Sequence, residues 1–186
     1  TMMNWTLLPV ALVLLCSSTL CSLGCDLTQG LQEDVSLLYQ MSTFSLLSCL
    51  KDRTDFKFPE EAVEGSQLQR ENAIVIVNET LQQIFNIFSL NTTPAEWNQT
   101  QLIQLLMGLD QQLEQLKSCV GQEVEWKEHL KSENPRIQAL QTYFQGINQY
   151  LQDKEYSRCA WEMVRIEIRR IFLFMDKPIR KLRKKA

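Results

Sequence analysis

Residues 137–151 read Ile-Gln-Ala-Leu-Gln-Thr-Tyr-Phe-Gln-Gly-Ile-Asn-Gln-Tyr-Leu. Five apolar side chains in this stretch follow one another at steps of 3, 4, 3 and 4: Ile137, Leu140, Phe144, Ile147 and Leu151. An α-helix turns once in about 3.6 residues, so these steps place all of them on one face. A β-strand would instead require alternation at every second residue. The stretch is therefore predicted to be an amphipathic helix with one buried face.

Four other stretches repeat this spacing, at residues 27–41, 74–88, 102–120 and 161–175. Their apolar stripes are Leu27, Leu31, Leu38 and Met41; Ile74, Val77, Leu81, Ile84, Phe85 and Phe88; Leu102, Leu106, Leu109, Leu113, Leu116 and Val120; and Trp161, Val164, Ile168, Ile171 and Met175. No stretch sustains period-two alternation, so the chain is predicted to be all-α, with five helices. Each stripe ends within about 20 residues, which is short for a coiled coil or a partner-binding zipper. We therefore expect the stripes to bury one another in a bundle.

The connection between the first and second predicted helices is long. It covers roughly residues 43–70, contains Pro59 and lacks helical periodicity. A crossover of this length allows neighbouring helices to run parallel. At the other boundaries, Thr93 is predicted to cap the third helix, Pro135 to lie in the first turn of the fourth, and Pro178 to end the fifth.

Charge is unevenly distributed along the chain. The 186 residues include 19 Lys and Arg against 22 Asp and Glu, a net charge of -3, which argues against a general nucleic-acid binder. Nine basic and two acidic residues fall in residues 165–186, so this end carries +7 and residues 1–164 carry -10. We expect a basic tail from about residue 176 that attracts an acidic partner such as heparan sulfate.

Residues 5–23 contain no charged side chain. Their apolar centre, residues 7–15, has the length of the hydrophobic region of a secretory signal peptide and is too short to span a bilayer. The small residues Ser22 and Gly24 precede Cys25 at positions suited to cleavage. We therefore expect residues 1–24 to be a signal peptide. Residues 25–186 are expected to form one secreted domain that does not insert into a membrane.

Four cysteines remain after removal of the expected signal peptide: Cys25, Cys49, Cys119 and Cys159. An even number of cysteines in an exported chain indicates disulfides, and four cysteines allow three pairings. No pair has the CxxC spacing of a zinc or redox site. Residues 25–186 also contain three Asn-x-Thr triplets, which are predicted glycosylation sites and begin at Asn78, Asn91 and Asn98; a fourth, at Asn4, lies in the expected signal peptide.

The sequence offers little for catalysis. It has one histidine, His129, and no Walker, GxGxxG, HExxH or GxSxG motif. Glu125 and Glu128 lie beside His129, an arrangement that is typical of a solvated surface rather than a catalytic or metal site. We predict a protein that is not an enzyme and needs no cofactor or metal. A secreted helical carrier, whose Leu and Phe stripes line a cavity for lipid, is the alternative to a signalling protein.

Several segments resemble the type I interferons. The most specific is Tyr-Ser-Arg-Cys-Ala-Trp-Glu at residues 156–162, which follows Tyr-Phe-Gln-Gly-Ile at residues 143–147. Also similar, and in the order of the family, are Ser-Cys-Leu-Lys-Asp-Arg at residues 48–53, Leu-Gln-Gln-Ile-Phe-Asn at residues 81–86 and Trp-Asn-Gln-Thr at residues 97–100. The resemblance covers nearly all of residues 25–175.

This resemblance implies a five-helix cytokine with a long first crossover connection and the disulfides Cys25–Cys119 and Cys49–Cys159. It also implies a secreted monomer that brings together the two chains of the type I interferon receptor. The expected outcome is antiviral and antiproliferative JAK-STAT signalling.

Two receptor-binding regions are implied by the same resemblance. Contacts with the high-affinity receptor chain are expected from Leu50, Arg53, Arg165, Arg169 and Arg170, and contacts with the low-affinity chain from Glu79 and Gln82. Because Trp161, Val164 and Ile168 are predicted to face the core, we expect the arginines of the last helix to point outward. Ile166 and Arg169 depart from the family, which usually has a small residue and an apolar residue there.

Overall fold

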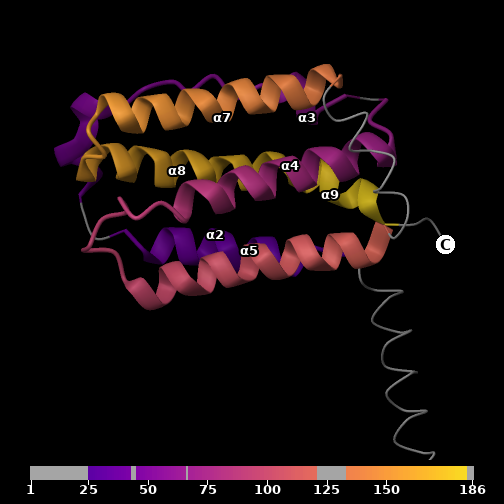
Figure 1. Cartoon of the computed structure of the whole chain (residues 1–186), viewed down its shortest axis with the longest axis horizontal. Coiled ribbons are helices and arrows are strands. Elements are labelled where there is room, and N and C mark those ends of the chain that lie inside the picture. Colours follow the sequence, from indigo (N-terminus) through magenta and orange to yellow (C-terminus); the bar gives the residue numbers. More distant parts are fainter. Residues whose placement is uncertain (1–24, 43–44, 66, 121–132, 184–186) are drawn as a thin grey trace, which may run out of the picture.

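A computed structural model describes residues 25–42, 45–65, 67–120 and 133–183, and these residues confirm the all-α prediction (Figure 1). The long helices are α2 (Thr28–Gln40), α4 (Arg70–Phe88), α5 (Gln99–Val120), α7 (Pro135–Asp153) and α8 (Arg158–Phe174). Three short elements accompany them: η1 (Leu46–Asp52), α3 (Glu60–Val63) and α9 (Asp176–Leu182). The expected signal peptide and His129 lie outside the described residues.

The long helices lie side by side, and contacts near their ends give their directions (Figure 1). The disulfide Cys25–Cys119 joins the start of α2 to the end of α5, so these two helices are antiparallel. The rings of Phe88 and Trp161 meet where α4 ends and α8 begins, so this pair is antiparallel as well. Ser42, just after α2, bonds Glu162 near the start of α8. Helices α2 and α4 therefore run parallel, as the long first connection allows.

Capping residues explain where the later helices begin. Pro135 lies in the first turn of α7 as predicted, and Asn134 Oδ1 accepts a hydrogen bond of 3.0 Å from the Arg136 N–H. The prediction for α5 was wrong, because the helix begins after Asn98 and not after Thr93. Asn98 Oδ1 accepts from the Gln101 N–H at 3.1 Å and so satisfies one of the free donors of the first turn.

The segment from residue 176 on, expected to be a basic tail, is helical in its described part. Residues 176–182 form helix α9, and Pro178, Ile179 and Leu182 are buried against α4. The fifth predicted helix does end before Pro178, because α8 stops at Phe174. Pro178 then lies in the first turn of a new helix, where its missing N–H costs nothing. The Asp176–Arg180 ion pair on the exposed side links consecutive turns.

The apolar stripes bury one another, and the expected two disulfides are present with the expected pairing, Cys25–Cys119 and Cys49–Cys159. The stripe of α5 differs in detail. Leu105 and Gln112 are buried there, whereas the predicted Leu106 and Leu113 are half-buried. Helix α5 packs against both α2 and α4, so its covered face is wider than a single 3,4 stripe.

Asn98 carries two separable roles, which a pair of substitutions can distinguish. Asn98→Ala removes both the cap and the glycosylation triplet, whereas Thr100→Ala removes only the triplet. In protein made in bacteria, without glycans, we expect Asn98→Ala to lower the free energy of unfolding by about 1 kcal/mol and Thr100→Ala to leave it unchanged. Urea unfolding measures this difference. Equal stability of the two variants would contradict the cap, and mass spectrometry of protein from mammalian cells would show whether both lose one glycan.

Candidate functional site

The first connection is fastened to the last two long helices. The disulfide Cys49–Cys159 joins η1 to α8, with the two Cα atoms 5.1 Å apart. The Tyr150 hydroxyl of α7 donates a hydrogen bond of 2.5 Å to the Asp52 carbonyl, and the Phe56 ring meets the Tyr150 ring edge-on at 5.0 Å. Burial, together with the charge of Asp52, raises the pKa of Tyr150 to about 12, so this phenol stays a donor at neutral pH.

A cleft of about 670 Å³ opens between this connection and α8. Its lining includes Leu46, Leu50, Arg53, Phe56, Met163, Ile166, Glu167 and Arg170. The cleft thus brings Leu50 and Arg53 onto one surface with Arg170, which lies more than 100 residues later in the chain. Ile166, where the sequence departs from the usual family residue, also lines this cleft, and its side chain is half-buried.

Arg170 is held at the edge of the cleft by a short chain of contacts. Its Nε lies 3.3 Å from Glu167 Oε2, and its guanidinium lies 5.4 Å from the centre of the Phe174 ring. Glu167 in turn accepts a hydrogen bond of 2.5 Å from the Tyr143 hydroxyl. Burial and the bond to Glu167 raise the pKa of Tyr143, so the phenol remains the donor. The guanidinium of Arg170 is therefore oriented while about half of its side chain stays accessible.

The rim of the cleft is apolar and carries an available cation. Leu46 and Leu50, which line the cleft, are both exposed. The guanidinium of Arg53 is exposed and makes no hydrogen bond or ion pair with a described residue. Exposed aliphatic side chains next to arginines are typical of protein–protein interfaces.

Sequence reasoning missed part of this surface, although a signal for it was present. Leu46 and Leu47 were missed; they fall, like the predicted Leu50, in a connection without helical periodicity, where exposed leucines are unusual. Met163 was missed because it lies outside the predicted stripe of α8.

The expectation that Arg165 points outward was wrong. This side chain is 3% exposed and donates hydrogen bonds to Glu162 Oε2 at 2.8 and 3.1 Å and to the Leu38 carbonyl at 2.6 Å. Glu162 is fully buried and also accepts a bond of 2.9 Å from Trp97 Nε1. Because α8 is covered by α2, η1 and α7, more than one stripe of the helix is buried. Arg165 is therefore a partner in an interior ion pair rather than part of the surface.

Arg169 is exposed, as expected, and continues the basic surface onto another helix. Its guanidinium lies 5.1 Å from the centre of the Tyr39 ring of α2, in a cation–π contact. Tyr39 is itself largely exposed. The contact thus joins α8 and α2 into one accessible surface, a role that the sequence pattern did not suggest for Tyr39.

The second predicted region is only partly accessible. Glu79 is 2% exposed, so its placement on the surface was wrong, whereas Gln82 is half-buried. Helix α4 packs against α5, α7 and α9, which together cover most of its circumference. Of the glycosylation triplets, Asn91 and Asn98 are exposed and Asn78 is half-buried.

The described part of the chain has no group of three or more His, Cys, Asp and Glu residues arranged to hold a metal ion. Among the described helices, none combines the length and the apolar character that crossing a bilayer would need.

Comparison with known proteins places the chain in a family. The pattern of the interferon alpha/beta domain matches residues 23–182. The chain belongs to the type I interferons. Interferon alpha-1 of Equus caballus is 46% identical over 167 residues, covering 88% of this chain and 91% of the relative. Interferon alpha-16 of Homo sapiens is 44% identical over 180 residues, covering 95% of each.

A solved structure supports the fold of this interferon. Zebrafish interferon 2 superimposes with a TM-score of 0.65 at 21% identity, covering 79% of this chain and 95% of the other. Type I interferons are antiviral cytokines, so the prediction of a signalling protein that is not an enzyme is confirmed. Family membership leaves the lipid-carrier alternative without support.

The interior and exterior arginines of α8 should respond differently to substitution. We expect Arg165→Ala to lower the free energy of unfolding by roughly 3–5 kcal/mol, because it leaves the buried Glu162 carboxylate without its cation. Arg170→Ala removes a partly exposed ion pair and should cost less than about 1 kcal/mol. Urea unfolding at neutral pH measures both values. Similar losses for the two variants would contradict the assignment of Arg165 to the interior.

Proposed function

We propose that this interferon is a secreted ligand that binds the two chains of the type I interferon receptor at once. Bringing these chains together would induce antiviral and antiproliferative JAK-STAT signalling. The observation that carries the proposal is the cleft at which Leu50, Arg53 and Arg170 converge. Its exposed leucines supply apolar area, and its two guanidiniums supply charge for an acidic receptor surface.

The mechanism requires rigidity rather than chemistry. The first connection is held against the bundle by the disulfide Cys49–Cys159 and by the hydrogen bond from Tyr150 to Asp52. This segment therefore needs little further ordering when the receptor binds. A surface fixed in advance loses less conformational entropy when it docks. The proposed second receptor chain would bind at the face of α4 that carries Gln82, whereas the buried Glu79 accepts a hydrogen bond from Gln83 of the same helix.

A cell assay tests the proposal directly. Purified protein spanning residues 25–186 is added to cells with an interferon-responsive reporter, and to matched cells that lack the receptor. We expect induction only in the cells that carry the receptor. A folded, disulfide-bonded sample that induces nothing in cells of the matching species would refute the proposal.

Substitutions at the cleft should weaken receptor binding without unfolding the protein. We expect Arg53→Ala and Arg170→Ala each to reduce affinity for the purified high-affinity receptor chain by roughly tenfold or more, as for interface anchors. Surface plasmon resonance gives the affinity. Lys117→Ala, which removes an exposed cation from α5, is the matched control and should bind normally. Affinity that is unchanged in both cleft variants would remove this surface from the receptor interface.

We further infer that the basic side chains of α9 bind heparan sulfate. Lys177 and Lys181 are exposed on this helix, whereas Arg180 and Arg183 already pair with Asp176 and Asp26. The double variant Lys177→Gln/Lys181→Gln should therefore elute from a heparin column at lower salt. The control Lys51→Gln/Lys117→Gln makes the same change in net charge elsewhere. Elution of the two double variants at the same salt concentration would show that net charge alone determines heparin binding, and would contradict a site on α9.

A further inference from the structure

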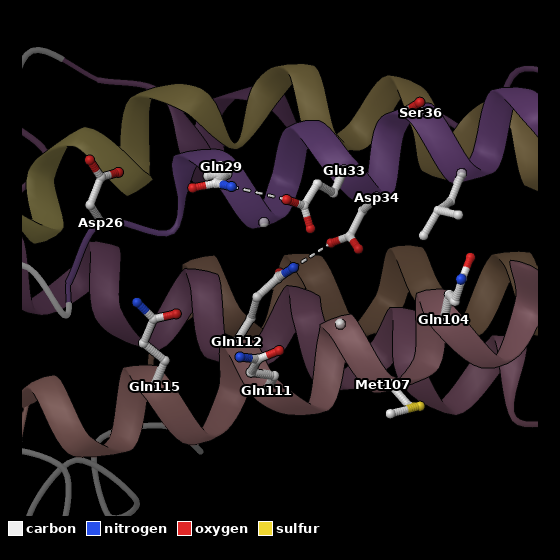
Figure 2. A pocket seen from close by; sticks show the side chains of 13 residues that line it. Asp26, Gln29, Glu33, Asp34, Ser36, Gln104, Met107, Gln111, Gln112 and Gln115 are labelled. Atoms are coloured by element: carbon white, nitrogen blue, oxygen red, sulfur yellow. Dashed lines mark hydrogen bonds between the residues drawn. The ribbon is translucent and has the colours of Figure 1, made fainter. Parts of the chain in front are cut away.

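A groove of about 720 Å³ runs between α2 and α5, on other elements than the cleft described above. Figure 2 shows Gln112 reaching from α5 toward Asp34 of α2, where its Nε2 donates a hydrogen bond of 2.7 Å to Asp34 Oδ2. Asp34 is 1% exposed and Gln112 is 4% exposed. They line the groove but expose too little surface to hold a larger ligand, so the ligand that the pair can take is a proton.

The pair is incompletely bonded. Gln112 Oε1 is buried and accepts no hydrogen bond from a described residue. Burial raises the pKa of Asp34 to about 7; the bond from Gln112 opposes this shift, and the charge of Glu33 adds to it. A protonated carboxyl group has an O–H donor that a carboxylate lacks. Protonation of Asp34 would therefore supply the donor that Gln112 Oε1 is missing.

Two glycines make room for this contact. A Cβ atom at Gly30 of α2 would lie 2.8 Å from Gln112 Nε2, and one at Gly108 of α5 would lie 3.1 Å from Asp34 Oδ1. Glycine weakens the interior of a helix. Its presence on both facing helices, beside the same buried pair, is explained if the pair needs this space.

The surrounding charges do not compensate Asp34. The other charged side chains of α2 and α5 are Glu33, Asp110, Glu114 and Lys117, and α8 directs Glu162, Arg165 and Arg169 toward α2. Glu114 and Lys117 pair with each other, and Glu162 pairs with Arg165. Arg169 lies over Tyr39. At the end of the groove, Asp26 pairs with Arg183. No cation bonds Asp34 among the described residues.

We propose that Asp34 and Gln112 form a proton-operated latch between α2 and α5. When Asp34 takes one proton from solvent, the single carboxylate–amide bond becomes a two-point acid–amide pair. In that pair the Gln112 N–H donates to one oxygen of Asp34, and the Asp34 O–H donates to Gln112 Oε1. The latch closes α2 on α5 in acid and loosens it in mildly alkaline solution.

The direction of the pH effect follows from the two pKa values of Asp34. The folded-state pKa lies above the value of 3.8 that is normal for an exposed Asp, so the folded protein holds the proton to higher pH than the unfolded chain does. Stability should therefore fall as the pH rises from about 3.8 to about 7 and level off above that range. The same helix carries Leu38, whose carbonyl bonds Arg165, so the latch acts on the helix that anchors α8.

NMR and hydrogen exchange on the intact domain test the latch. We expect the Asp34 carboxyl carbon to titrate near pH 7 and amide protection factors in α2 to rise about tenfold from about pH 8 to about pH 5.5. Amides of α7 that exchange through local opening provide the internal reference, because α7 contributes no residue to the groove. The melting temperature should rise by roughly 5 °C over the same interval.

Matched variants separate the latch from general acid effects. Asp34→Asn offers the N–H donor at every pH, so its α2 protection should be high and independent of pH. Glu33→Gln, a neighbouring change of the same kind, should retain the pH response. Titration of Asp34 below about pH 5 in the unmodified protein would overturn the proposal, whether or not Asp34→Asn folds. An undiminished pH response of α2 in Asp34→Asn would overturn it as well.

Discussion

The buried carboxylate of Glu162 is the constraint on which the rest of this structure depends. It is fully buried and accepts hydrogen bonds from Arg165 of α8, from Trp97 just before α5, and from Ser42 just after α2. A buried carboxylate that loses such partners costs several kcal/mol. The start of α8, the end of α2 and the turn before α5 must therefore keep their relative positions.

The buried network around Glu162 also determines the geometry of the proposed docking surface. Arg165 extends the network to the Leu38 carbonyl, and this fixes the turn of α2 that places Tyr39 under Arg169. On the other side of α8, the disulfide Cys49–Cys159 sets the distance to η1 and its exposed leucines. A helix with a buried ionic network on one side and a disulfide at its first turn can present accessible arginines in a defined geometry.

Periodicity predicted the five long helices to within a few residues, because each buries a stripe that repeats every three or four residues. It failed where a helix is covered from several directions. Arg165 and Glu79 lie beside the predicted stripes, and neighbouring helices bury these positions as well. Helix α8 ends before Pro178 as predicted, but periodicity did not predict the short helix α9, in whose first turn this proline lies. The cysteine pairing came from the family resemblance, since spacing alone left three pairings open.

Helix α2 lies between two buried carboxylates that are neutralised in different ways. Toward α8, Glu162 faces the guanidinium of Arg165, and the two charges compensate each other within the network. Toward α5, the partner of Asp34 among the described residues is the amide of Gln112, which can donate a hydrogen bond but carries no charge. The first arrangement resists change because removing either partner leaves a buried charge. The second can lose its charge by taking up a proton, so it is the side of α2 on which solution conditions can act.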